Sequence, residues 1–147
     1  MFIKLTSSQI PAFWELYKQS LIVSKNIPKK YQQEYANKQL EKMLTGASQA
    51  WMGYEVDENG EKRIQYTMTT RIVSEEQRGI RVIYVSSLYR YGGIDTDMLG
   101  EANAAVEKWA KTQGCKAIIV EYILDVMEGY LADHGYETFL KMSRRFI

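Results

Sequence analysis

The stretch over residues 82–110 constrains the fold of this chain most, because it joins a predicted strand, a glycine turn and a predicted helix without a break. Residues 81–88 are rich in Val, Ile and Tyr and contain no Gly or Pro, which favours a strand. Residues 90–95 carry two adjacent glycines, so the backbone there can adopt conformations that other residues resist. Residues 95–113 repeat apolar side chains at helical spacing, which predicts a helix; these are Met98, Leu99, Ala102, Ala105, Val106 and Trp109.

This order of elements can bind an anion, because the first turn of a helix has free N–H groups that point toward the preceding turn. The same order also occurs in α/β connections that bind nothing, and a short glycine motif does not separate the two cases. The residues of this stretch alone therefore leave both interpretations open.

Composition narrows the class of protein. The chain has 147 residues, 46% of them hydrophobic and 25% charged, which predicts one globular domain over 1–147. A net charge of +1 does not indicate nucleic-acid binding, and no apolar run is long enough to predict a membrane span. One Cys and one His give no disulfide and no His-rich metal site, so we expect no metal and a reducing, cytoplasmic location.

The first half of the chain predicts two helices between strands. Residues 1–6 alternate as a short strand, a helix begins near Ile10 and Pro11, and a second helix over 29–44 ends at Gly46. From residue 49 the apolar period changes to two, which predicts strands over 49–56, 62–73 and 81–88. Asn59-Gly60 is a strong hairpin signal, so we expect an antiparallel meander.

The second half predicts a crossover. Gly114 ends the long helix and residues 116–122 form an apolar strand, so strand, helix and strand should place 116–122 parallel to 81–88. A short helix over 125–133 and a last strand or hairpin over 136–147 follow. The predicted class is α/β (α+β), with a mixed sheet, a central parallel pair and flanking helices. We expect five residues to be buried together beneath the long helix: Ile83, Val106, Trp109, Ile118 and Val120.

Two stretches, together with this order of elements, resemble the GCN5-related N-acetyltransferase (GNAT) family. Leu88-Tyr89-Arg90-Tyr91-Gly92-Gly93-Ile94-Asp95 is similar to the acetyl-CoA loop of that family. Tyr130-Leu131-Ala132-Asp133-His134-Gly135-Tyr136-Glu137 is similar to its late signature, in which a short helix ends in a Gly-aromatic pair.

The resemblance implies acetyl-CoA as cofactor and an amine as its second substrate. It implies that the pyrophosphate lies on the glycine turn, that the pantetheine arm lies between two splayed strands, and that a backbone N–H meets the oxyanion. It also implies an acid that protonates the leaving thiolate. The cofactor-binding residues that it implies are Leu88, Arg90, Gly92, Gly93, Ile94 and Asp95.

Three departures from the family pattern bear on activity. Asp95 stands where the family has a small residue, and its carboxylate would repel the pyrophosphate. Leu131 stands where the family often has the tyrosine acid, and the adjacent Tyr130 would point about 100° away around the helix. Residues 81–88 hold no acid that could act as a base, which leaves Glu121 on the following strand as the nearest carboxylate.

The sequence therefore supports two hypotheses. The first is an acetyl-CoA-dependent N-acyltransferase, with Glu121 and Tyr130 as its candidate catalytic residues. The second is a non-catalytic structural or binding protein on the same fold, such as a component of a tailed-phage particle, with protein partners or a homo-oligomer in place of substrates.

Overall fold

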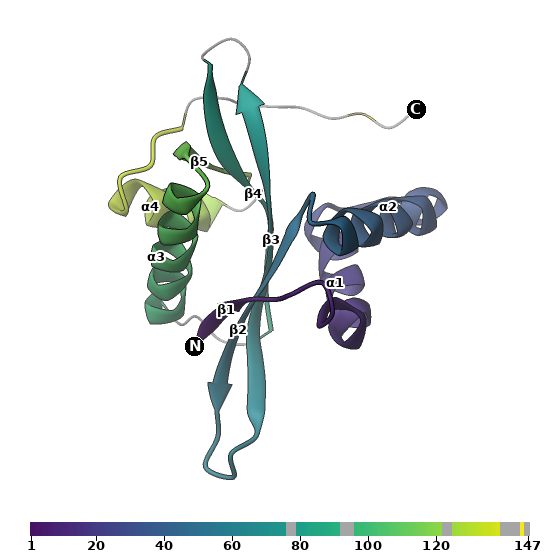
Figure 1. Cartoon of the computed structure of the whole chain (residues 1–147). Helices are drawn as coiled ribbons and strands as arrows, with labels where there is room; N and C mark the ends of the chain where they lie inside the picture. The colour runs from purple at the N-terminus through teal and green to yellow at the C-terminus, as the bar shows by residue number, and fades with distance from the viewer. Residues whose placement is uncertain (76–78, 92–95, 122–124, 139–144, 146–147) are drawn as a thin grey trace.

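A computed structural model describes residues 1–75, 79–91, 96–121, 125–138 and 145 of the chain (Figure 1). Within these residues the chain forms a mixed sheet with helices on both of its faces. The elements, in chain order, are β1 (Phe2–Lys4), α1 (Ile10–Ser24), the 3₁₀ helix η1 (Lys29–Tyr31), α2 (Gln32–Thr45), β2 (Gln49–Val56), β3 (Lys62–Glu75), β4 (Ile80–Arg90), α3 (Thr96–Thr112), β5 (Cys115–Val120) and α4 (Asp125–Asp133).

The sheet has the predicted topology. Its described strands lie in the order β1-β2-β3-β4-β5, with antiparallel pairing from β1 to β4 and a parallel β4–β5 pair. Ile83 of β4 lies opposite Ile118 of β5, which confirms the crossover through α3. The meander strands are longer than expected, since β3 runs to Glu75 and β4 to Arg90. Arg90, predicted to open the glycine turn, is instead the last residue of β4, because it pairs with Tyr66.

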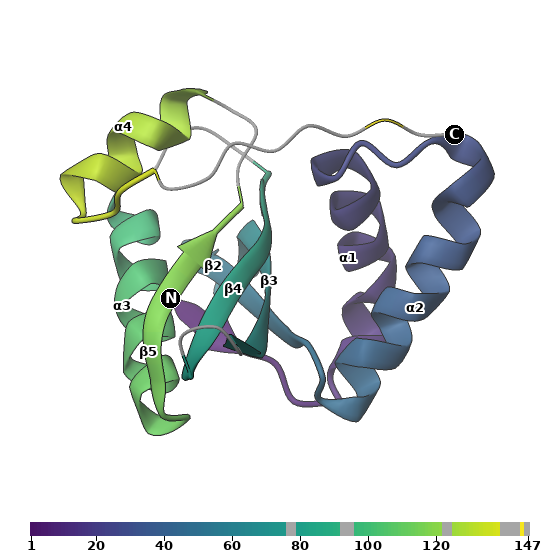
Figure 2. The same ribbon diagram turned by 90° about the horizontal axis from the view of Figure 1, so that it is seen from above.

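Helices cover the two faces of the sheet in separate layers (Figure 2). α1 and α2 lie on one face, and α3 and α4 lie on the other. The core on the α1 side contains Leu5, Ile10, Tyr17, Leu21, Met43, Ala50 and Met52. The core on the α3 side contains Trp51, Met68, Ile83, Val85, Val106, Ala110 and Cys115.

The predicted core beneath α3 is confirmed in part. Ile83 and Val106 are buried, whereas Trp109, Ile118 and Val120 are only partly buried and pack against that core. Trp109 meets the ring of Trp51 edge-on at 5.7 Å, and Lys4 of the short strand β1 lies over the Trp109 ring. Ile118 and Val120 belong to β5, which is the edge strand of the described sheet.

The segment after α4 differs from the sequence prediction where the structure describes it. His134 donates its N–H to the oxygen of Leu131, and Gly135 has a φ of +81°, so these residues end the helix as expected. Residues 136–138 are not in a strand, and the predicted last strand otherwise lies outside the described residues. No helix in the described part of the chain is long and apolar enough to cross a membrane.

Candidate functional site

The described pairing between the two parallel strands of the sheet stops where β5 ends. Their pairing runs from Arg81–Cys115 to Val85–Val120, and the N–H of Glu121 then donates to the oxygen of Val85 at 3.2 Å. β4 continues to Arg90, but no later β4–β5 pair occurs within the described residues. Past Val85, the edge of β4 that faces β5 therefore has peptide groups without a partner strand in this part of the structure.

A β-bulge lies directly after the last β4–β5 pair. Thr69 pairs with Ser87 and Thr70 pairs with Val85, so Ser86 is an extra residue in β4. A bulge bends its strand and leaves the extra residue outside the regular ladder. Directly after the bulge, the buried hydroxyls of Thr69 and Ser87 share a hydrogen bond of 2.6 Å, which fixes the register again. We name the edge of β4 over residues 86–90, past its last pair with β5, the β4–β5 opening.

The candidate cofactor residues divide into two groups. Leu88 is half-buried and packs on the α3-side core, and Arg90 is exposed at the end of β4 with no ion pair to any described carboxylate. Gly92, Gly93, Ile94 and Asp95 lie outside the described residues, so their roles stay predictions. The structure places Leu88 and Arg90 at the β4–β5 opening, because both belong to the part of β4 past Val85.

Tyr91 anchors the start of the glycine turn to the opposite helical layer. Its N–H donates to the oxygen of Gln65 at 2.8 Å, and its hydroxyl donates to the oxygen of Leu16 in α1 at 3.1 Å. Burial raises the pKa of Tyr91, so the hydroxyl stays a donor at neutral pH. The residue before the predicted phosphate loop is thereby held at a fixed position.

Tyr130 of α4 has a buried hydroxyl that makes no hydrogen bond in the described structure. Its ring stacks on His134, with centroids 4.2 Å apart. Burial raises the pKa of Tyr130, and the neighbouring Tyr66 raises it further. Burying a hydroxyl without a hydrogen-bond partner costs about 1–3 kcal/mol of folding free energy. This hydroxyl is therefore suited to a ligand that supplies the missing hydrogen bond.

The residue that the family pattern points to, Leu131, is buried and only 7% exposed. Tyr130 is displaced by one position around the helix from the family position, so helical spacing argues against it. Its hydroxyl is nevertheless covered by protein, which helical geometry alone did not reveal.

Glu121 lies one residue past the end of β5 and is exposed. Its carboxylate forms an ion pair with Lys25, the residue that follows α1. The second catalytic candidate is therefore at the β4–β5 opening, but it faces the α1 layer, whereas Tyr130 comes from the α4 layer.

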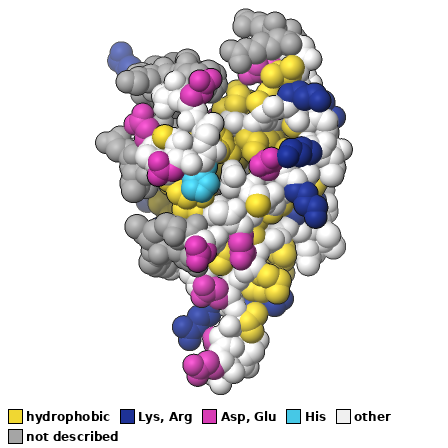
Figure 3. Space-filling model, turned by 90° about the vertical axis from the view of Figure 1, so that its left-hand side faces the viewer, with side chains coloured by type: hydrophobic (Ala, Val, Ile, Leu, Met, Phe, Trp, Pro, Cys, Tyr) yellow, Lys and Arg dark blue, Asp and Glu magenta, His cyan; other side chains and the backbone are white. Residues whose placement is uncertain are grey.

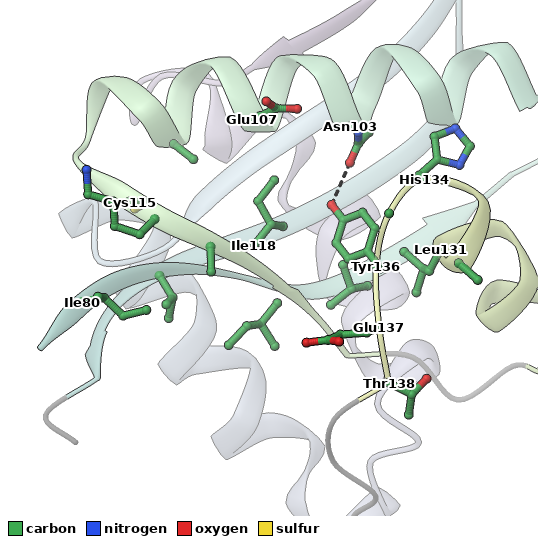
Figure 4. A pocket seen from close by; sticks show the side chains of 18 of the residues that line it. Ile80, Asn103, Glu107, Cys115, Ile118, Leu131, His134, Tyr136, Glu137 and Thr138 are labelled. Atoms are coloured by element: carbon green, nitrogen blue, oxygen red, sulfur yellow. Dashed lines mark hydrogen bonds between the residues drawn. The ribbon is translucent and has the colours of Figure 1, made fainter. Parts of the chain in front are cut away.

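A separate pocket of about 610 Å³ lies between β5, α3 and α4 (Figures 3 and 4). In Figure 3 hydrophobic side chains gather in the middle of this face, with acidic side chains around them. In Figure 4 Tyr136 points toward α3, where its hydroxyl donates to Oδ1 of Asn103 at 2.7 Å. Leu88, Arg90 and Tyr130 do not line this pocket, so it is distinct from the β4–β5 opening. Among the described residues, no three His, Cys, Asp or Glu side chains are grouped to hold a metal ion.

Solved structures of known proteins share the fold of this chain. No protein-family model matches the sequence, and no curated protein is similar to it in sequence. Among solved structures, a probable acetyltransferase has a TM-score of 0.73 at 11% identity, over 100% of this chain and 96% of its own. A predicted acetyltransferase from Clostridium acetobutylicum, solved with acetyl-CoA, has a TM-score of 0.67 at 16% identity, over 97% and 95%. A GCN5-related N-acetyltransferase from Ralstonia eutropha JMP134 has a TM-score of 0.69 at 12% identity, over 99% and 97%.

Proposed function

Because the chain has the fold of the GCN5-related N-acetyltransferases, we propose that it is an N-acyltransferase with acetyl-CoA as acyl donor and a primary amine as acceptor. The observation that carries the proposal is the bulge at Ser86, which follows the last β4–β5 pair directly. A strand edge with unpaired peptide groups fits an extended ligand that carries amides of its own, as the pantetheine arm of acetyl-CoA does.

The residues around the β4–β5 opening suit this donor. β4 offers peptide groups past Val85 to the pantetheine amides, and Arg90 adds a positive charge beside the predicted phosphate loop. That loop leads into α3, whose N-terminal N–H groups favour a phosphate. Acetyl-CoA would supply an acetyl thioester. The remaining chemistry belongs to side chains and peptide groups of this chain.

We assign the acid role to Tyr130. Its hydroxyl is buried, makes no other hydrogen bond in the described structure and stays protonated at neutral pH because burial raises its pKa. It can therefore protonate the departing sulfur as the C–S bond breaks. Glu121 can accept the proton that the amine loses as the C–N bond forms. A peptide N–H near Ser86 can stabilise the negative charge that develops on the thioester oxygen.

Binding is the first test. Isothermal titration calorimetry and thermal unfolding with acetyl-CoA should show a complex that stabilises the fold by about 2.7 kcal/mol at a hundredfold excess over Kd. Asp95→Gly should raise the affinity, because it removes a carboxylate from the predicted phosphate loop. Micromolar binding by the unmodified protein would contradict a blocking role of Asp95. An absence of binding in both proteins would overturn the proposal and favour the non-catalytic alternative, with protein partners instead of substrates.

Turnover is the second test, measured as release of free CoA thiol with a panel of primary amines. Tyr130→Phe should lower kcat about 10²–10⁴-fold, the usual contribution of a general acid, while the complex with acetyl-CoA still forms. Tyr84→Phe is the matched control, because Tyr84 is a half-buried tyrosine on β4 before the bulge. Equal kcat values for the two variants would remove Tyr130 from the mechanism.

A further inference from the structure

An amine of this chain already lies beside the β4–β5 opening. The ammonium of Lys25 pairs with the carboxylate of Glu121, across 96 residues of sequence. The N–H of Glu121 makes the last described hydrogen bond between β4 and β5, to Val85, and the bulged Ser86 comes next. Lys25 is therefore held beside the last described hydrogen bond between the two segments.

The backbone around Lys25 fixes the direction from which its side chain comes. The N–H of Lys25 caps α1 by donating to Leu21, and the next residue, Asn26, has a φ of +48°. That value lies in the left-handed region, where non-glycine residues are uncommon and Asn is enriched. Ile27 then donates back to Ile22 at 3.1 Å. This tight turn places Lys25 at the end of α1, on the sheet face opposite α4.

Lys25 also differs from other ion-paired lysines of the chain. Its side chain is 22% exposed, whereas those of Lys38 and Lys111 are 65% and 71% exposed. Lys38 and Lys111 pair with carboxylates one turn away on their own helices, as surface lysines often do. Lys25 instead pairs between layers, at the site that the proposed function assigns to acyl transfer.

We propose that the protein acetylates itself on Nζ of Lys25, an inference that rests on the proposed function. Glu121 accepts a proton from the Lys25 ammonium, and the free amine attacks the thioester carbonyl carbon. A C–N bond forms, the C–S bond breaks, and the leaving sulfur takes a proton from Tyr130. The second proton of the attacking nitrogen passes through solvent to the Tyr130 oxygen, so that acetyl-Lys25, free CoA and a protonated Glu121 result, and Glu121 then releases its proton to solvent. Lys25 comes from the end of α1 and Tyr130 from α4, on opposite faces of the sheet (Figure 2).

Acetylation changes the charge at the opening. The amide has no positive charge, so the Lys25–Glu121 ion pair is lost and the Glu121 carboxylate is released to face other groups. Because Lys25 is one residue in each chain, the reaction stops at one acetyl group per molecule.

The experiment is incubation of the full chain with acetyl-CoA, followed by peptide mass spectrometry over time. Lys25 should be acetylated at least tenfold faster than Lys38 and Lys111, at a first-order rate that does not depend on protein concentration. Chemical acetylation with acetic anhydride should show the reverse order, because it follows exposure. Tyr130→Phe and Glu121→Gln should each slow Lys25 at least tenfold and leave Lys38 and Lys111 unchanged.

Two outcomes would overturn the inference: equal rates at the three lysines, or a Lys25 rate that Tyr130→Phe does not change. The proposed function is judged separately, with calorimetry and the thiol assay on Lys25→Arg. If that variant binds acetyl-CoA and acylates added amines while Lys25 of the unmodified protein stays unacetylated, self-acetylation is wrong and the proposed function stands. If neither the unmodified protein nor Asp95→Gly binds acetyl-CoA, both are wrong.

Discussion

The hydroxyl of Tyr17 donates a hydrogen bond of 2.5 Å to the main-chain oxygen of Trp51, between α1 and β2. Tyr17 is fully buried in the α1-side core, whereas the indole of Trp51 belongs to the core on the other face of the sheet. The indole Nε1 also donates to Oγ1 of Thr70 at 3.0 Å. One residue of β2 thus connects both helical layers.

Tyr17→Phe should lower the free energy of unfolding by about 1–2 kcal/mol, because it removes one buried hydrogen bond and leaves the ring in place. Urea unfolding measures the change. Tyr84→Phe should be close to neutral, since the Tyr84 ring is half-buried and lies under Arg71. Indistinguishable midpoints for the two variants would mean that the Tyr17 hydrogen bond contributes nothing net.

The two tryptophans under α3 should differ in their contributions. Trp51 is 3% exposed, so Trp51→Ala should lower the free energy of unfolding by about 3–5 kcal/mol. Trp109 is half-buried, so Trp109→Ala should cost about 3 kcal/mol or less. Because the rings meet edge-on at 5.7 Å, the double variant should reveal a coupling energy of about 0.5–1.5 kcal/mol. If the two single effects on the free energy of unfolding add up to that of the double variant, the contact between the rings contributes no stability of its own.

The period of the apolar residues and the positions of turn-forming residues determined most of the fold prediction. The period of two from residue 49, the Asn59-Gly60 hairpin and the crossover after Gly114 are each local signals, and the sheet contains all three features. Strand ends were predicted less well, because the strand pairing that extends β4 to Arg90 comes from Tyr66 on β3. Trp109 illustrates the same limit, since helical spacing gives its face but not its distance from the edge of the sheet.

The candidate site was harder to predict than the fold. The bulge at Ser86 depends on how β4 pairs with Thr69 and Thr70, and nothing in its own strand sequence indicates it. The partnerless hydroxyl of Tyr130 and the Lys25–Glu121 ion pair also depend on packing between layers that are distant in sequence. The phosphate-loop prediction on Gly92, Gly93, Ile94 and Asp95 remains a prediction.

Alkaline pH should destabilise the fold partly through Tyr136. Its pKa is about 12, first because it is buried and then because the charge of Glu107 lies nearby. The unfolded chain has the ordinary pKa of about 10, so the folded state holds the proton more tightly. The stabilisation is complete below pH 10 and is lost as the pH rises from about 10 to about 12.

The measurement is urea unfolding at several pH values across this window. Tyr136→Phe should make the slope of the unfolding free energy against pH shallower by up to about 1.4 kcal/mol per pH unit, the value for one proton. Other tyrosines with raised pKa values also make the unfolding free energy depend on pH. Only the difference in slope between wild type and Tyr136→Phe is therefore informative. Glu107→Gln should shift the window to lower pH because it removes the repelling charge. Parallel pH profiles for wild type and Tyr136→Phe would contradict the raised pKa.

Gly53 of β2 lies beneath the start of α3, where three side chains would have to move by a few tenths of an ångström to admit a methyl group. A Cβ at this position would be 3.1 Å from Sδ of Met98, 3.2 Å from Cδ2 of Phe2 and 3.3 Å from Cδ2 of Tyr66. Gly53→Ala should therefore lower the free energy of unfolding by about 1–3 kcal/mol, the usual range for overpacking. Gly100→Ala and Gly129→Ala are matched controls, because both glycines lie in helices with nothing within 4 Å of the added Cβ.

Those two controls should raise the free energy of unfolding by about 0.5–1 kcal/mol each, since alanine has the better helix propensity. Met98 is flexible and nearest to the added methyl, so Gly53→Ala should cost less in a Met98→Ala background than in wild type. We expect a coupling energy of at least about 0.5 kcal/mol from the four proteins of this cycle, measured by urea unfolding. Strict additivity would place Met98 away from Gly53.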